Sequence, residues 1–478
     1  MPSLRRNIVY QFLYELLIVF IPLFTIPYVS RVLGAENIGL FSYTYAVANY
    51  FVLFANLGIK NYGSRTIAMV RNNKEELNRN FSEILSIHII FSIIVIFVYL
   101  VLLFFFVEDN LVIFLIQSIY VFAAVFDINW FFFGIEKFKL TVGRNTLVKI
   151  LSVFLVLVFV KTQTDLWIYA LILALSVFVG QSVVWFALKQ YVSWRRPSWA
   201  NMKQHIRPLF VLFLPILALS LYKYMDKIML GSISSNVQVG FYENAEKIIN
   251  VPMSLIMAFG VVLMPRIANM VTSKDKGEVF KLIDMSMEAV MLLAIAISFG
   301  LAGISFVLAP IFFGYEFEEC GILIMGLAVT VPFMAFANVI RTQYLIPYKE
   351  DKIFVVSLFL GAAVNLIVNI ILIPCMAARG AVIGTIFAEI IVCIYQSYFV
   401  RKKIFIKKYL LNTIPPILIG IVMFVFVFQI GNVMNINIVT LILQLLVGMF
   451  IYAVGVFLLM LKSRTRLMVL LRKFVVRY

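Results

Sequence analysis

The stretch IIFSIIVIFVYLVLLFFFV, residues 89–107, contains no charged side chain. A helix of about 20 apolar residues is long enough to cross the hydrocarbon core of a bilayer. The apolar residues are continuous rather than alternating, which argues against a strand of a membrane β-barrel. A helix satisfies its own backbone hydrogen bonds in lipid. This stretch therefore predicts a membrane-spanning helix.

The rest of the chain has the same character. Its 478 residues are 63% hydrophobic and 13% charged, with a mean hydropathy of +1.03. Soluble proteins carry about 25% charged residues, so we expect an all-α polytopic membrane protein with about fourteen transmembrane helices. The first run contains Glu15 and lacks a small-residue cleavage site, so we expect an uncleaved anchor. The expected spans are 8–32, 37–59, 82–107, 111–134, 145–162, 166–188, 208–230, 240–263, 285–309, 320–340, 353–374, 379–400, 409–430 and 437–461.

The basic residues indicate the topology. Most of the 40 Lys and Arg residues lie at the two ends of the chain and in every second loop between the expected spans. The other set of loops carries only Arg31, Lys161 and Arg379. Loops rich in Lys and Arg stay in the cytoplasm, so both termini are expected there. The net charge of +17 is therefore a topology signal and does not indicate nucleic-acid binding.

A weak internal repeat predicts the domain organisation. When the chain is slid over itself, Gly39 falls on Gly240, Asn49 on Asn250 and Arg65 on Arg266. The offset spans six helices, which predicts two parallel six-helix lobes around a cavity. We expect an N-lobe at 1–190, a cytoplasmic linker at 191–207, a C-lobe at 208–400, and two further helices with a basic tail at 401–478.

Polar side chains share one face on the first, second, seventh and eighth expected spans. Such groups are costly inside a membrane, so their presence indicates a functional or a structural role. Candidates for substrate binding are Tyr45, Asn49, Lys223, Lys227, Lys247 and Asn250. Carboxylates that could carry a coupling ion are Glu15, Asp226, Glu243, Glu246 and Glu389. Alternatively, the charges of the seventh and eighth spans form a neutral ion-pair network that is only structural.

Three arginines at helix ends form a second group of candidates. Arg65 and Arg266 end the second and eighth spans on the cytoplasmic side, and under the repeat they face each other across the cavity mouth. Arg31 lies on the opposite side, where basic residues are scarce. Guanidinium groups match phosphate oxygens in bidentate geometry. The alternative is that Arg65 and Arg266 are ordinary topology anchors.

The residues that usually carry chemistry are scarce. Cys320, Cys375 and Cys393 form no motif with the two histidines, His88 and His205, so no metal site, catalytic residue or cofactor is expected. There is no nucleotide-binding signature.

Several stretches resemble the Wzx-type polysaccharide flippases. They include IPYVSRVLGAENIGLFSYTYAVANYF (26–51), LGIKNYGSRTIA (57–68), INWFFFGIEKFK (128–139), NLIVNIILIP (365–374) and GAVIGTIFAE (380–389). The resemblance runs in order through about residue 400. It implies a MATE-like fold of the MOP superfamily in the bacterial plasma membrane. It also implies diphosphate contacts at Arg31, Arg65 and Arg266, which stand in or near the matching motifs.

The expected function is export of an undecaprenyl-diphosphate-linked oligosaccharide by alternating access. H⁺ or Na⁺ coupling and contacts with the polysaccharide polymerase machinery are left open. A cation-coupled multidrug exporter of the same architecture is the main alternative, and it would need fewer cavity cations. A membrane-bound polymerase is the second alternative, but it would need a larger outside loop than the chain offers.

Overall fold

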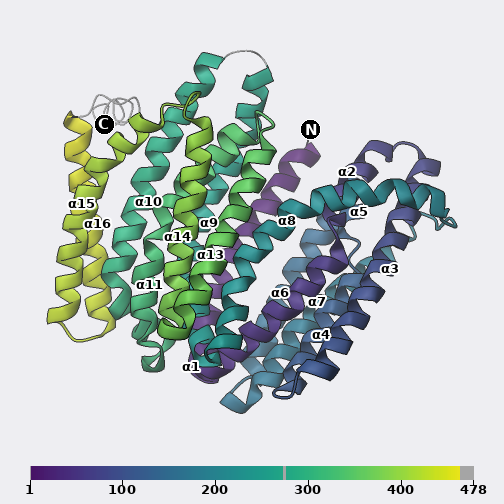
Figure 1. Ribbon diagram of the computed structural model, residues 1–478, viewed down its shortest axis with the longest axis horizontal. Helices are drawn as coiled ribbons and strands as arrows, with labels where there is room; N and C mark the ends of the chain where they lie inside the picture. The colour runs from purple at the N-terminus through teal and green to yellow at the C-terminus, as the bar shows by residue number, and fades with distance from the viewer. Residues whose placement is uncertain (1, 273–275, 463–478) are drawn as a thin grey trace. The chain divides into compact units, whose positions relative to one another are not determined.

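The computed structural model describes residues 2–272 and 276–462. Over these residues the chain is almost entirely helical and contains no strand (Figure 1). The α-helices are α1 (Pro2–Asn56), α2 (Ile59–Val70), α3 (Lys74–Phe106), α4 (Leu111–Val125), α5 (Asn129–Gly134), α6 (Phe138–Phe159), α7 (Leu166–Leu188), α8 (Trp199–Ile233), α9 (Asn236–Thr272), α10 (Lys276–Phe313), α11 (Cys320–Ala328), α12 (Thr330–Ile340), α13 (Asp351–Met376), α14 (Ala378–Val400), α15 (Ile406–Val433) and α16 (Ile438–Lys462). Short turns of other helix types are η1 (Gln163–Asp165), η2 (Tyr315–Phe317) and the π-helical η3 (Arg341–Leu345).

Thirteen helical segments of the described chain are long and apolar enough to cross a membrane, which confirms the expected fold class. The first two expected spans are joined in α1, which bends at Gly34 (φ 76°, ψ 172°). Only glycine adopts this backbone conformation readily. The fourth expected span is divided into α4 and α5, and Asp127 lies in the break between them. The tenth span continues beyond its expected end through η3.

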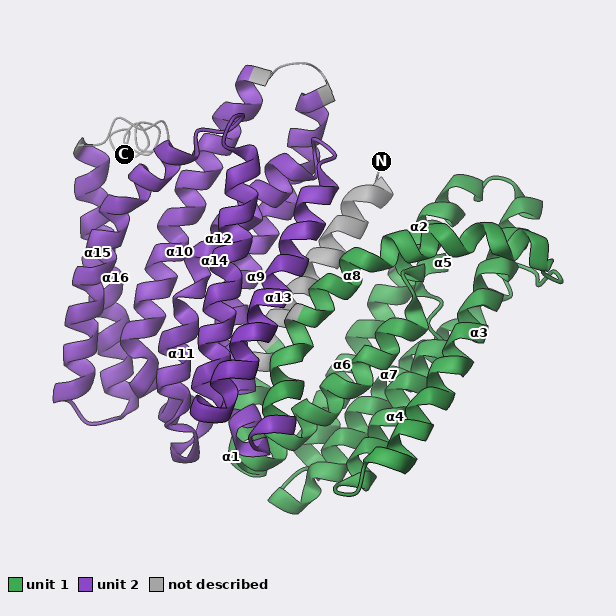
Figure 2. Ribbon diagram, in the orientation of Figure 1, with its two compact units in different colours: residues 1–231 green, residues 232–478 purple. Residues whose placement is uncertain are grey.

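The chain forms two compact units, residues 1–231 and residues 232–478 (Figure 2). Almost all of α8 belongs to unit 1. Gly58, at the start of α2, lies so close to α8 that a Cβ atom there would be 2.8 Å from the Leu209 carbonyl oxygen. The lobe boundaries expected from the sequence remain a prediction.

The aromatic stretch at 128–139 forms part of the core of unit 1. The Trp130 ring stacks on Phe81 of α3, with centroids 5.6 Å apart, and Phe131 and Phe132 are fully buried. Gly63 of α2 packs against the same indole, where an added Cβ would lie 2.5 Å from the ring. Aromatic groups of this size contribute much of the packing energy of a core. This motif therefore joins α2, α3 and α5.

Arg144 connects three helices inside unit 1, although the sequence placed it in a cytoplasmic loop. Its guanidinium donates to the Gly180 carbonyl of α7 at 2.6 Å and to Asn129 Oδ1 of α5 at 3.1 Å. The Asn129 amide in turn donates to Asp127 at 2.7 Å and to Gln181 at 2.8 Å. Buried polar groups must be hydrogen-bonded to be tolerated in an apolar environment. The network meets this requirement and fixes the break between α4 and α5.

Unit 2 contains the tight helical hairpin α13–α14, which turns at Ala377 (φ 49°). Asn365 and Asn369 of α13 are buried and hydrogen-bonded to each other at 3.2 Å. Gly384 of α14 lies against Asn369, where an added Cβ would be 2.2 Å from Oδ1. Small residues allow membrane helices to approach closely. Helices α15 and α16 pack on α10 through Ile304, Val307, Met423, Val427 and Leu441.

We predict that Gly58→Ala destabilises the protein. Gly58 has φ 71°, and its Cβ would meet the backbone of α8. The left-handed conformation alone costs a non-glycine residue about 1–2 kcal/mol, so the thermal midpoint in detergent, followed by tryptophan fluorescence, should fall.

The control is Gly143→Ala. Gly143 lies within α6, and an added Cβ there would have no neighbour within 4 Å. Alanine favours a helix over glycine by about 1 kcal/mol, so the midpoint should stay or rise. Equal losses in the two variants would contradict the account of the α2–α8 contact.

Candidate functional site

Unit 1 brings two of the expected polar faces together, on the second half of α1 and on α8. The ammonium groups of Lys223 and Lys227 interact electrostatically with the Tyr45 hydroxyl. The Asp226 carboxylate interacts in the same way with the Tyr50 hydroxyl. The Tyr50 hydroxyl also donates to the Ser220 carbonyl of α8 at 3.4 Å. We refer to this α1/α8 region as the polar face of unit 1.

The polar face carries buried charge. Asp226 is 4% exposed and Lys227 is 7% exposed, and both have interaction partners. Lys223, one turn earlier, is exposed, and its ammonium lies over the Tyr224 ring at 5.2 Å from the centroid. A buried lysine is costly in a membrane helix unless charge or water compensates it. The face therefore combines one sheltered cation with one that is accessible.

Aromatic rings and an amide border these cations. Tyr45 stacks on Phe41, with centroids 5.6 Å apart, and meets Tyr120 edge-on at 5.1 Å. Tyr50 meets Tyr224 edge-on at 5.9 Å. Asn49 donates its amide to the Tyr45 carbonyl at 2.8 Å, which fixes its side chain along α1. Such a surface offers stacking area, hydroxyl groups and positive charge to a polar ligand.

In unit 2 the expected residues lie on α9. Lys247 and Glu243 form an ion pair at 3.1 Å along the helix, so the positive charge of this lysine is partly neutralised. Glu246 is half-buried and Asn250 is exposed. This pairing fits the alternative that the charges of the eighth expected span form a purely structural ion-pair network. A network that also includes the charges of α8 remains a prediction.

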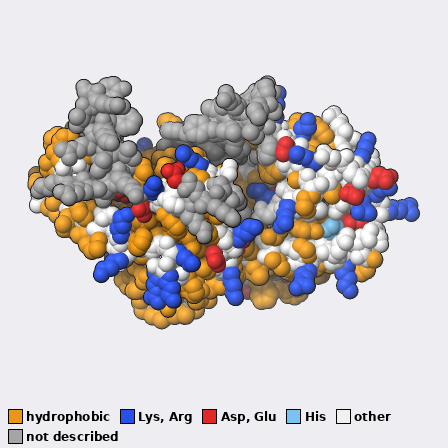
Figure 3. All heavy atoms as spheres, turned by 90° about the horizontal axis from the view of Figure 1, so that it is seen from above, with side chains coloured by type: hydrophobic (Ala, Val, Ile, Leu, Met, Phe, Trp, Pro, Cys, Tyr) orange, Lys and Arg blue, Asp and Glu red, His pale blue; other side chains and the backbone are white. Residues whose placement is uncertain are grey.

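The three candidate arginines are all exposed. Arg31 lies in α1 near the bend, Arg65 in α2 and Arg266 near the end of α9. Arg65 belongs to unit 1 and Arg266 to unit 2, and the expectation that they face each other remains a prediction. Figure 3 shows Lys and Arg side chains scattered over the face that is seen from above, with fewer Asp and Glu. The side chain of Glu15 lies outside the described part of the structure.

The sequence analysis named Glu389 as a candidate but missed the polar side chains of unit 2 that surround it. Glu389 of α14 is 6% exposed, and its charge acts on Arg341, which begins η3. The Arg341 guanidinium donates to Asn338 Oδ1 at 2.5 Å. Gln343 is fully buried. The sequence assigned Arg341 to a cytoplasmic loop, whereas the structure places it at the start of the π-helical turn that extends α12. Such turns occur frequently at functional sites.

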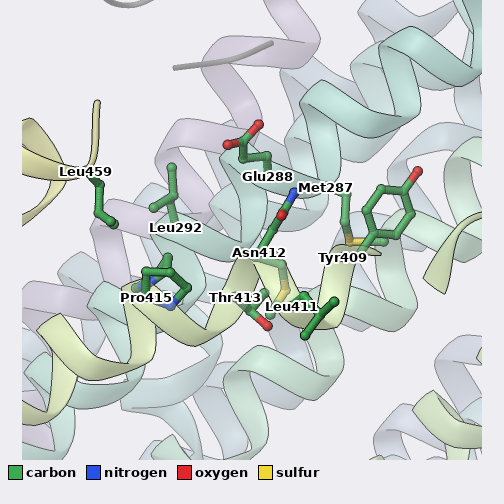
Figure 4. Close-up of a pocket in the computed structure, with 11 residues that line it drawn as sticks. Met287, Glu288, Leu292, Tyr409, Leu411, Asn412, Thr413, Pro415 and Leu459 are labelled. Carbon is green, nitrogen blue, oxygen red and sulfur yellow. The ribbon is translucent and has the colours of Figure 1, made fainter. Parts of the chain in front are cut away.

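Unit 2 also contains a cavity of about 960 Å³ between α9, α10, α15 and α16. Its lining is almost wholly apolar and includes Leu301, Met423, Leu445 and Phe457, with Gln444 as a polar exception. A smaller pocket of about 110 Å³ shares Leu292 with it. Figure 4 shows the Glu288 and Asn412 side chains beside each other in the smaller pocket, with Leu459 and Pro415 also lining it. The larger cavity suits an alkyl or isoprenoid chain better than a polar ligand.

Comparison with known proteins identifies relatives in sequence and solved structures with the same fold. One relative, named "Putative O-antigen transporter" from Shigella dysenteriae, is 24% identical over 408 residues, which cover 82% of this chain and 99% of the relative. Two solved structures share the fold. A lipid II flippase MurJ in an inward closed conformation has a TM-score of 0.71 at 16% identity and covers 94% of this chain and 97% of its own. An inward-facing multidrug resistance MATE family transporter of the MOP superfamily has a TM-score of 0.63 at 14% identity, covering 83% and 97%.

The family assignment follows from the sequence itself. The model of the polysaccharide biosynthesis protein family matches residues 4–271, which include almost all of unit 1 and of the polar helices α8 and α9. The chain is a multi-pass membrane protein and belongs to the polysaccharide biosynthesis protein family.

Proposed function

We propose that this protein is a flippase that moves an undecaprenyl-diphosphate-linked oligosaccharide from the inner to the outer leaflet of the bacterial plasma membrane. The observation that carries the proposal is the polar face of unit 1, where Lys223 and Lys227 lie among tyrosines within an apolar bundle. The repeat unit belongs to a capsule, an O-antigen or a teichoic-type polymer. The O-antigen transporter relative and the family membership support this class of cargo.

The charge of the cargo fits the polar face. A diphosphate cannot enter hydrocarbon without compensation, whereas lysine ammonium groups bind phosphate oxygens by charge-assisted hydrogen bonds. Tyr45 and Tyr50 offer aromatic surface and hydroxyl groups to the sugars next to the diphosphate. We assign head-group binding to Lys223, Lys227, Tyr45 and Asn49. Arg31, Arg65, Arg266, Lys247 and Asn250 are further contacts along the route in this proposal.

The lipid tail has a separate requirement, because it must stay in an apolar environment throughout transport. The large cavity of unit 2 has an almost purely apolar lining, and we assign it to the polyprenyl chain. Burial of apolar surface contributes about 25 cal/mol per Å², so even partial insertion of the chain adds substantially to binding.

The energy source is also part of the proposal. The cell interior is negative, so outward movement of two negative charges is favourable by about 4–5 kcal/mol per 100 mV. In this proposal the membrane potential alone supplies enough free energy to drive export by alternating access. Coupling of H⁺ or Na⁺ through Glu15, Asp226, Glu243, Glu246 or Glu389 would add to it. We also propose that the protein contacts the polysaccharide polymerase machinery.

The main alternative is a cation-coupled multidrug exporter. The buried carboxylates Asp226 and Glu389 favour it, since exporters of cations need such groups, and the MATE neighbour shares the fold. The sheltered Lys227 argues against a cationic cargo. A polymerase is less well supported, because the relatives are named as transporters and the loops between helices are short.

Flipping of the lipid by reconstituted protein tests the proposal. Liposomes with the purified chain and a fluorescent undecaprenyl diphosphate oligosaccharide should show protein-dependent movement between leaflets. Movement toward the positive side should become faster with an imposed potential, because the cargo is anionic. Efflux of a cationic dye together with no movement of the lipid would replace the proposal by the exporter alternative.

We predict that Lys223→Gln with Lys227→Gln weakens binding of the diphosphate head roughly ten- to hundredfold. A hydrogen bond to a charged group contributes about 1.5–3 kcal/mol, and each 1.4 kcal/mol is tenfold in affinity. Binding would be measured by fluorescence polarisation in detergent with a short-chain analogue.

The control is Lys149→Gln, which removes a membrane lysine from α6 of the same unit. Lys223→Arg with Lys227→Arg should retain most of the binding, and monodispersity of each variant shows that it is folded. Unchanged affinity in the folded double glutamine variant would exclude these lysines from the head-group site.

A further inference from the structure

Three polar side chains from three helices meet inside unit 1. The Tyr62 hydroxyl of α2 lies 2.6 Å from His205 Nδ1 of α8. His205 Nε2 lies 2.9 Å from Glu83 Oε2 of α3. The His205 and Glu83 side chains are 3% and 1% exposed, while Tyr62 is half-buried. None of the three belongs to the polar face of unit 1.

The surroundings of this triad are apolar. Leu57, Ile59, Met202 and Leu209 belong to the buried cluster between α2, α3 and α8. The short helix α5, which packs on α2, carries no titratable residue. His88, farther along α3, interacts electrostatically with Asp127. The charged side chains nearest to the triad in sequence are all exposed: Lys60 and Arg65 of α2, Glu76 and Arg79 of α3, and Lys203 and Arg207 of α8.

Charge balance limits what the closed triad can hold. Glu83 Oε1 is buried and has no hydrogen-bond partner, so the carboxylate depends on the imidazole for compensation. An imidazolium beside a carboxylate is neutral overall, and so is a neutral imidazole beside a carboxylic acid. Both forms contain one proton more than a neutral imidazole beside a carboxylate. Loss of that proton leaves a buried negative charge, which is strongly destabilising.

We propose that Glu83, His205 and Tyr62 form a proton-binding site whose occupancy holds α2 and α3 against α8. The proton is exchanged with the cytoplasmic side, where the sequence places this end of the helices. When the imidazolium releases its proton, Glu83 keeps its negative charge and the three helices separate enough to admit water. The site goes beyond the proposed transport and does not depend on the cargo.

Tyr62 can partner both protonation states of the imidazole. When His205 is charged, its Nδ1–H donates to the tyrosine oxygen. When His205 is neutral with its proton on Nε2, the tyrosine hydroxyl donates to Nδ1 instead. Being half-buried, Tyr62 is also the member of the triad nearest to solvent.

The helices joined by the triad also touch directly. Gly58 begins α2 against the Leu209 backbone, and α8 is the helix that leads from unit 1 into unit 2. A change at His205 therefore acts on the helix that connects the two units. Such a site would link proton exchange to the conformation of unit 1 without any contact with the cargo.

Histidine-selective ¹⁵N NMR tests the proposal directly, since the chain has only two histidines. In the His88→Gln variant, the remaining histidine signals come from His205. We expect these signals to change from imidazolium to neutral imidazole as the pH is raised. In the background of His88→Gln, Glu83→Gln should change the pH dependence of these signals, because it removes the compensating charge. An imidazole that keeps one protonation state throughout, or the same titration in both variants, would overturn the proposal.

Hydrogen exchange gives a second readout. After correction for intrinsic pH dependence, the amides of peptide 57–70 should exchange faster as His205 loses its proton. His205→Gln should remove this pH response, while His88→Gln should retain it. Tyr62→Phe leaves the carboxylate in place, so it provides a further variant if Glu83→Gln does not fold. The Tyr62→Phe variant should keep the pH-dependent change of the NMR signals and should alter the ¹⁵N chemical shift of His205 Nδ1. A pH response that survives His205→Gln would contradict the link between the proton and the α2 contact.

Discussion

Hydrocarbon offers no hydrogen-bond partner, so a polar group that this chain carries into the membrane is costly unless it finds a partner within the protein or lines a wet surface. Arg144 meets this constraint through carbonyl and amide oxygens of α7 and α5. Asn365 and Asn369 meet it through each other. Lys223 and Lys227 of α8 meet it beside Tyr45 of α1 and, for Lys223, the ring of Tyr224. These polar contacts lie within cores that are otherwise built from buried apolar side chains.

The same constraint explains which features could be predicted from the sequence. Apolar runs indicate helices without knowledge of their neighbours, and the expected spans match the observed helices within a few residues at most ends. The polar faces of α1 and α8 were also visible, because helical periodicity alone brings Tyr45 and Asn49, or Lys223 and Lys227, to one side. The two expected spans at 8–32 and 37–59 lie on either side of the kink at Gly34 within α1.

Contacts between distant segments could not be predicted. Arg144 and Arg341 stand at expected helix ends, where arginine is usually a topology anchor, and only their partners on other helices reveal an interior role. Likewise, Glu83 and His205 are 122 residues apart in sequence. A single histidine in a basic segment gives no sign that a buried carboxylate faces it. For Arg65 and Arg266 the residue type alone suggested a phosphate site. Both side chains are exposed, and they belong to different units, so the phosphate site remains a prediction.

The central claim is that the anionic head of a polyprenyl diphosphate lies on the polar face of unit 1 while its tail uses apolar surface. Photo-cross-linking with two forms of the lipid, one with a diazirine on the first sugar and one with a diazirine near the end of the tail, tests it most directly. We expect the sugar probe to label peptides of α1 and α8 around Tyr45 and Lys223, and the tail probe to label α10, α15 or α16. Labelling of the same lipid-facing peptides by both probes, with none on α1 or α8, would contradict the account.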